Sequence, residues 1–201
     1  MRPMFDDRPV FLVGGGASLR GFNFRTLSRR QTIAINLAHH PVPWASVLFF
    51  ADDNFFEEHR EPHGWHFWKV KDVERIVTTA PACAGMAPGE RSRVEYVDPL
   101  SLRIRDGRRW QNVHQMNSGA QAIALARKLG ARTIVLLGFD NAPGHWAEGE
   151  PYMHPRQPGP EAFERYAEDF EKLARFDLGV VNATPGSALT CFPAGDLADF
   201  L

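Results

Sequence analysis

The chain has 201 residues, with 23 Lys and Arg against 24 Asp and Glu, and a formal net charge of −1. A nearly neutral chain has no long-range field that would recruit a polyanion, so nucleic-acid binding is not indicated. No apolar run approaches the roughly 20 residues that span a bilayer, and residues 1–9 lack the apolar region of a signal peptide. We therefore expect a cytoplasmic protein without a membrane segment, folded as one α/β domain over residues 1–201.

A run of three glycines directly follows the first predicted strand, Pro9 to Val13. Glycine permits positive φ angles and leaves backbone N–H groups bare, and loops of this kind bind phosphates. The run is neither a GxGxxG fingerprint with a long helix nor a P-loop with its lysine, so a tight turn is the alternative. The candidate phosphate-binding residues of this loop are Gly14, Gly15, Gly16 and Ser18.

Polar residues also follow the next predicted strands. The strand over 31–35 ends at Asn36, and the strand over 45–51 ends at Asp52, Asp53 and Asn54, one of which should cap a helix. Further strands are predicted over 74–80 and 93–97, and Asp106-Gly107 predicts a hairpin turn within 103–110. Turn chemistry explains some of these polar residues, and a shared crevice at the strand ends is the other explanation.

Residues 117–140 contain a complete helix and strand. Asn117 or Ser118 can cap the helix, Gly119 lets backbone amides approach a ligand, and Gly130 can end the helix in the left-handed conformation. The aliphatic run from Thr133 to Leu137 is typical of a strand that is covered on both faces.

Strands and helices that alternate in this way predict one doubly wound, Rossmann-like α/β sheet, mostly parallel, with helices on both faces. Such sheets bind ligands outside the carboxyl ends of their strands. The candidate nucleotide-binding residues there are Asn36, Asp52, Asn117, Ser118, Gly119 and Asp140.

The segment 141–160 is long, irregular and rich in proline and glycine, so it is predicted to be a mobile lid loop. It carries two histidines, His145 and His154. An imidazole with a pKa near 6.5 can take a proton from a hydroxyl group at neutral pH, so both are candidate catalytic bases, with a surface role as the alternative.

Several separated motifs resemble one family. GGGASL followed by FNFRTL is similar to the opening loop of the bacterial lipooligosaccharide sialyltransferases. Ile35-Asn36 and residues 53–56 are similar to their next two strand ends, and residues 117–140 to their serine-glycine helix and the strand after it. The same layout is found in a group related to archaeal hydroxymethylpterin pyrophosphokinases and in small prophage-encoded proteins, which this chain resembles most.

The resemblance implies a cytidine nucleotide-sugar across the strand ends and a histidine base in the loop after the aspartate strand. His154 is then the preferred base, because it lies nearer the following helix, as the base of the family does. The leaving phosphate would meet the glycine loop, the helix start at 117–119 and Tyr152.

Three functions are compatible with the sequence. The first is a glycosyltransferase-like transferase that uses a nucleotide-activated small molecule as its substrate, with no cofactor or metal firmly implied. The second is a pyrophosphokinase-like phosphoryl transferase, in which Asp52, Asp53 or Asp140 would hold magnesium. The third is a non-catalytic nucleotide-binding module of phage origin. A homo-oligomer is compatible with each of them.

Overall fold

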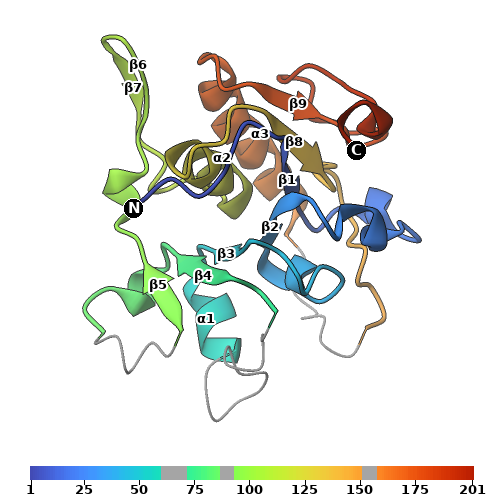
Figure 1. Ribbon diagram of the computed structural model, residues 1–201, viewed down its shortest axis with the longest axis horizontal. Helices are drawn as coiled ribbons and strands as arrows, with labels where there is room; N and C mark the ends of the chain where they lie inside the picture. The colour runs from blue at the N-terminus through green and yellow to red at the C-terminus, as the bar shows by residue number, and fades with distance from the viewer. Residues whose placement is uncertain (60–71, 87–92, 151–157) are drawn as a thin grey trace.

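The computed structural model describes residues 1–59, 72–86, 93–150 and 158–201, and in these parts a seven-stranded sheet forms the centre of the molecule (Figure 1). The strand order is β5-β4-β3-β2-β1-β8-β9, and all neighbours pair in parallel. This confirms the predicted Rossmann-like α/β sheet. The strands are β1 (Val10–Val13), β2 (Gln31–Ile35), β3 (Val47–Phe50), β4 (Arg75–Thr78), β5 (Val94–Tyr96), β8 (Ile134–Leu137) and β9 (Val180–Asn182).

The central strands are buried on both faces because both faces are covered. In β1, Val10 and Leu12 pack into the core that contains α2 (Ser118–Lys128) and α3 (Pro160–Ala174). The alternate side chains of the same strand, Phe11 and Val13, pack into a second core that contains α1 (Asp53–His59). Successive side chains of a strand point to opposite faces, so an unbroken aliphatic run is the composition that this position requires.

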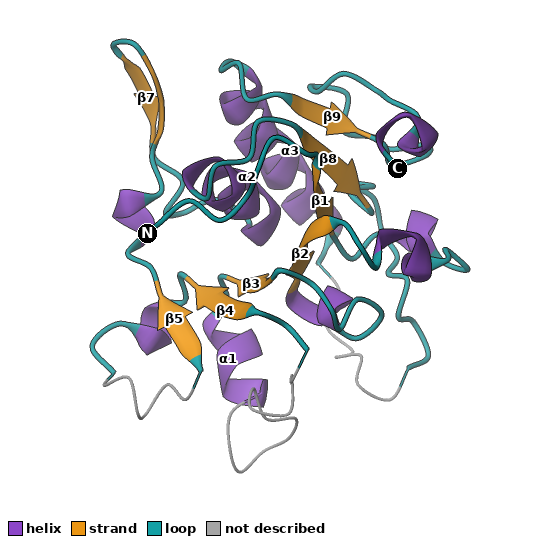
Figure 2. Cartoon of the chain, in the orientation of Figure 1, coloured by secondary structure: helices purple, strands orange, loops and turns teal. Residues whose placement is uncertain are grey.

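The connections change face where the strand order reverses. The buried hydrophobic residues that the structure describes in the first four connections, such as Leu19, Ala38 and Phe55, belong to the core on the α1 face. The helices before and after β8, α2 and α3, cover the opposite face, where they lie together (Figure 2). Because crossovers between parallel strands are right-handed, the connections move to the opposite face of the sheet when the chain begins to add strands on the other side of β1. The reversal lies between β1 and β8, and such a switch point is where open α/β sheets bind ligands.

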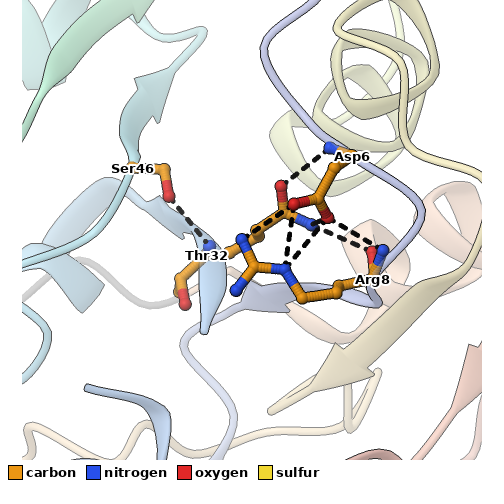
Figure 3. Close-up of polar contacts among 5 residues, drawn as sticks. Asp6, Arg8, Thr32 and Ser46 are labelled. Carbon is orange, nitrogen blue, oxygen red and sulfur yellow. Dashed lines mark hydrogen bonds and ion pairs between the residues drawn. The ribbon is translucent and has the colours of Figure 1, made fainter. Parts of the chain in front are cut away.

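Polar contacts join the amino ends of the strands, at the edge opposite this crevice (Figure 3). The Asp6 carboxylate accepts hydrogen bonds from the backbone N–H and the guanidinium of Arg8, which lowers the pKa of that carboxyl. Gln31, the first residue of β2, donates to Asp6 and accepts from its backbone N–H. The hydroxyl of Ser46 accepts a hydrogen bond from the N–H of Thr32 at 3.3 Å. These contacts align the start of β2 with the segments before β1 and β3.

The local elements follow the sequence closely. Asn117 caps α2, and Gly130 has a φ of +106° just after that helix, as predicted. The predicted hairpin is present as β6 (Ile104–Asp106) and β7 (Arg109–Gln111), an antiparallel pair that projects from the body (Figure 1). Most strands are one or two residues shorter at an end than predicted, which is usual where pairing frays.

Several connections between the strands, and the segment after β9, contain 3₁₀ helices. They are η1 (Ala17–Leu19), η2 (Phe24–Leu27), η3 (Asn36–His39), η5 (Pro81–Cys83), η6 (Pro99–Ser101) and η7 (Leu197–Phe200). Among the helices of the described residues, none has both the length and the apolar composition that crossing a membrane requires.

Candidate functional site

A cavity of about 360 Å³ lies at the carboxyl ends of the strands, at the switch point of the sheet. Its walls come from the ends of β1, β2 and β8, from the starts of the segments after β3 and β8, and from α2 and α3. Nearly all the sequence-predicted site residues that the structure describes line it. They are Gly14, Gly15, Gly16, Asn36, Asp52, Asn117, Ser118, Gly119, Asp140 and His145. Ser18 does not line the cavity, and His154 and Tyr152 lie outside the described residues.

The glycines of the first loop are required by close contacts. The expectation of positive φ angles is wrong here, because none of the three has one. A Cβ atom on Gly14 would approach the carbonyl oxygen of Gly138 to 2.7 Å, and one on Gly16 would approach the Asp140 carboxylate to 1.8 Å. A Cβ on Gly15 would lie 2.5 Å from Nε2 of His145. Glycine is needed because neighbouring segments touch this backbone directly.

Alternate amides of the loop are already bound to the protein. The N–H groups of Gly14 and Gly16 donate to the carbonyl oxygens of Leu137 and Gly138, at 2.8 and 2.9 Å. Gly15 also lines the cavity, and its N–H has no acceptor among the described residues. Within this loop, Gly15 therefore offers the amide that a ligand in the cavity can use.

Asp140 holds the loop that follows the glycines. Its Oδ1 accepts from the N–H of Ser18 at 2.8 Å, and its Oδ2 accepts from the Ser18 hydroxyl at 2.7 Å. Both residues were predicted to bind the nucleotide, but these contacts give them a role in positioning the glycine loop. The carboxylate still lines the cavity, with both oxygens already bound to donors.

The start of α2 presents the second set of free amides. Oδ1 of Asn117 caps the N–H of Ala120 at 3.0 Å, and the Ser118 hydroxyl donates to Asp52 at 2.9 Å. The N–H groups of Ser118 and Gly119 have no acceptor among the described residues, and both residues line the cavity. Because the helix dipole is positive at this end, an anion is stabilised here.

The amide of Asn117 itself is tied to α3. Both its backbone N–H and its side-chain amide donate to Oδ2 of Asp169, at 2.9 and 3.2 Å. This contact fixes the start of α2 against α3, and sequence analysis missed it because the two residues are 52 positions apart.

Two asparagines with unusual backbone conformation line the cavity. Asn36 and Asn141, with φ angles of +52° and +51°, are the non-glycine residues with positive φ in the described parts of the chain. Oδ1 of Asn36 is buried and has no hydrogen-bond partner there. A strained residue with an unsatisfied buried acceptor is typical of a functional site, and it indicates a ligand or water that donates to Asn36.

An aromatic wall closes the cavity, formed by Phe139 after β8 and by Phe163, Tyr166 and Phe170 of α3. Phe170 is buried in the core, whereas Phe163 and Tyr166 are only half-buried. None of these four aromatic residues is among the site residues predicted from the sequence. Burial, with a smaller contribution from Asp52, raises the pKa of Tyr166, so its phenol stays protonated at neutral pH.

No Lys or Arg is among the described residues that line the cavity. Its two carboxylates, Asp52 and Asp140, each accept a hydrogen bond from a serine hydroxyl. An anion in this cavity would therefore be bound by neutral N–H groups and a helix dipole, and not by an ion pair with a described residue.

Each carboxylate proposed for magnesium in the second function accepts a hydrogen bond from the protein. Asp53 accepts the N–H of Ala82 at 2.7 Å, while Asp52 and Asp140 bind the serines described above. Within the described ranges, no group of three His, Cys, Asp or Glu side chains is arranged to hold a metal ion.

No protein-family model matches the chain, and no curated protein matches it in sequence. A solved structure does match: the sialyltransferase CstII from Campylobacter jejuni, in complex with the substrate analogue cytidine-5'-monophosphate. The TM-score is 0.59 with 14% identity, and the match covers 93% of this chain and 84% of that one. At this identity the likeness concerns the fold, and prophage origin and the pterin pyrophosphokinase group stay predictions. The chain therefore has a sialyltransferase-like α/β fold.

Proposed function

We propose that this chain is a glycosyltransferase-like transferase that binds a nucleotide-activated sugar in the cavity at the switch point. The observation that carries the proposal is the convergence there of the free amides of Gly15, Ser118 and Gly119 with the unsatisfied acceptor of Asn36. The amides suit a phosphate, and the acceptor suits a donor group of a base or sugar.

The charge of the cavity favours a donor with one phosphate. Two carboxylates and no described cation line it, so a second or third phosphate would add negative charge without a compensating group. A nucleoside monophosphate needs only a few N–H donors. The fold neighbour supports the same choice, because it is a sialyltransferase described with cytidine-5'-monophosphate.

The aromatic wall gives the donor an apolar surface. Phe163 and Tyr166 are half-buried at the cavity, where the flat faces of a base or the apolar face of a sugar ring can pack against them. The Tyr166 phenol, kept protonated, is available as a hydrogen-bond donor.

The reaction needs a base for the acceptor hydroxyl, and His154 is the residue we propose for it. The acceptor oxygen would form the new bond to the anomeric carbon as the bond from that carbon to the phosphate oxygen breaks. The electron pair of the broken bond stays on the phosphate, and the hydroxyl proton goes to the imidazole.

A ligand panel tests the proposal. Thermal denaturation and calorimetric titration would be run with the monophosphates and triphosphates of cytidine, uridine, guanosine and adenosine, with and without magnesium. We expect cytidine monophosphate to raise the melting temperature without magnesium, because every donor invoked belongs to the protein. Binding of nucleoside triphosphates that depends on magnesium would favour the pyrophosphokinase reading instead.

A second assay separates a transferase from a binding module. The assay measures the release of cytidine monophosphate from a cytidine-activated acidic sugar, first with candidate acceptors and then with water alone. Release under either condition indicates turnover. If the protein binds the nucleotide tightly but releases no cytidine monophosphate from the donor under any of these conditions, the non-catalytic nucleotide-binding module is favoured.

A further inference from the structure

His145 has a fixed place beside the glycine loop. It lines the cavity, and its ring occupies the space where a side chain on Gly15 would be. A Cβ on that glycine would lie 2.5 Å from Nε2 and 2.7 Å from Cδ2 of the ring. The Nε2 edge of the imidazole is therefore packed against the residue whose amide is free for a ligand.

Three backbone contacts hold this arrangement. The N–H of Trp146 donates to the carbonyl oxygen of Gly15 at 3.1 Å, and the guanidinium of Arg20 donates to the carbonyl oxygen of His145 at 3.3 Å. The N–H of His145 donates to Oε1 of Glu148 at 3.1 Å, and Glu148 also pairs with Arg20. The backbone around His145 is therefore fixed by Gly15, Arg20 and Glu148, and the imidazole is held beside the glycine loop.

The ring contacts select one tautomer. Nδ1 accepts a hydrogen bond from the N–H of Ala147 at 3.0 Å, so this nitrogen carries a lone pair and no proton. In a neutral imidazole the proton is then on Nε2. A second proton, on Nδ1, would oppose the Ala147 N–H directly. Burial also lowers the pKa of His145, an effect that Arg20 supports and Glu148 opposes, so the neutral form is favoured.

A base needs the opposite arrangement, with a lone pair facing the acceptor hydroxyl. The lone pair of His145 is occupied by a backbone amide, and its remaining nitrogen is a donor without an acceptor among the described residues. Resting on the proposed function, we infer that His145 donates its Nε2–H to a phosphate oxygen of the nucleotide-activated donor, next to the N–H of Gly15.

This role requires no proton transfer from the imidazole. When the bond between the anomeric carbon and the phosphate oxygen breaks, the electron pair remains on that oxygen. The two N–H groups then stabilise the added charge by hydrogen bonding. No described Lys or Arg lines the cavity, so a neutral hydrogen-bond donor such as His145 adds affinity for the phosphate there. The protonation state of the imidazole does not change in this role.

The tautomer is tested by NMR on protein labelled with ¹⁵N at histidine. We expect long-range ¹H–¹⁵N spectra near pH 7.5 to show a protonated Nε2 and an unprotonated Nδ1 for His145. Cytidine monophosphate should shift the Nε2 resonance and leave the tautomer unchanged. An Nδ1–H tautomer, or a charged ring at that pH, would overturn the inference.

Two substitutions separate a donor from a base. His145→Gln keeps an N–H donor near the position of Nε2, whereas His145→Leu keeps the bulk and loses the donor. We expect the leucine variant to bind cytidine monophosphate about 10- to 100-fold more weakly, and the glutamine variant to retain most of the affinity. A base would instead lose turnover equally in both variants with nucleotide affinity unchanged, which would overturn the donor role.

His114→Gln is the matched control, since His114 is exposed and does not line the cavity. Melting temperatures of all three variants check that they fold. If the wild type binds no nucleotide, the proposed function fails and the phosphate role fails with it. If wild-type binding survives His145→Leu unchanged, only the role of His145 is overturned.

Discussion

Asp140 and Ser18 are 122 residues apart and are joined by two hydrogen bonds, one from the serine N–H and one from its hydroxyl. The carboxylate after β8 thus fixes the loop after β1, across the switch point of the sheet. Any ligand bound by the amide of Gly15 depends on this contact, because the contact sets where the loop lies.

Asp140→Ala tests that dependence. The change leaves the half-buried N–H of Ser18 without its acceptor, so the free energy of unfolding should fall by about 1–3 kcal/mol. Nucleotide affinity should fall as well, and amide hydrogen exchange at Ser18 should become faster. Asp7→Ala is the control, because the one polar contact of the Asp7 side chain with the described residues is an exposed ion pair with Arg132. Equal stability of the two variants would contradict the positioning role.

Gly119→Ala tests the close packing at the start of α2. The added Cβ would lie 2.9 Å from the ring of Phe139 and 3.0 Å from that of Phe170. We expect a loss of about 1–3 kcal/mol in stability from overpacking, and weaker nucleotide binding because the helix start must shift. Gly159→Ala is the control, since a Cβ there meets nothing within 4 Å. Chemical denaturation and calorimetric titration measure both effects, and wild-type behaviour of Gly119→Ala would count against the site.

Asn36 allows strain and ligand binding to be separated. Asn36→Gly removes the side-chain acceptor but suits the φ of +52°, so stability should hardly change while nucleotide affinity falls. Asn36→Ala should lose affinity too, and also about 1–2 kcal/mol of stability, because an alanine in the left-handed region is strained. Unchanged affinity in the glycine variant would mean that the buried Oδ1 is satisfied by water and not by the nucleotide.

Protonation of His145 should make the fold sensitive to acid. Its pKa is lowered in the folded state, so the unfolded chain binds the proton first as the pH falls below about 6.5. The contribution of His145 to stability is thus complete above that pH and is lost progressively as the pH falls toward the lowered value. Urea unfolding near pH 7.5 and near pH 5.5 should show a larger loss for the wild type than for His145→Gln. The same loss in both would exclude this histidine as the cause.

His154→Gln tests the base, which lies outside the described residues. General-base catalysis contributes on the order of 10²- to 10⁴-fold, so turnover should fall by that factor while the affinity for cytidine monophosphate changes little. A large loss of nucleotide affinity would assign His154 to the donor site instead. The predicted lid over 141–160 can be followed in the same variants by hydrogen exchange with and without nucleotide.

The local pattern of the sequence was sufficient to predict the sheet, a cap at Asn117 or Ser118, the helix end at Gly130 and the polar residues at the strand ends. These features depend on the preferences of a few neighbouring residues: aliphatic runs for buried strands, side-chain oxygens for caps and glycine for left-handed turns. Because parallel strands end at the same edge, the sequence by itself also placed Asn36, Ser118 and Asp140 in one crevice.

Only the tertiary structure decided what those residues do there. In the structure, Asp140 accepts hydrogen bonds from Ser18, Asp52 from Ser118 and Asp169 from Asn117. Three carboxylates therefore position the site, a role that residue type alone does not indicate. The tertiary structure also placed Phe163 and Tyr166 of α3 at the cavity, and the imidazole of His145 where a side chain on Gly15 would be. These contacts join residues tens of positions or more apart, and their partners are set by the packing of whole elements, on which local sequence preferences carry no information.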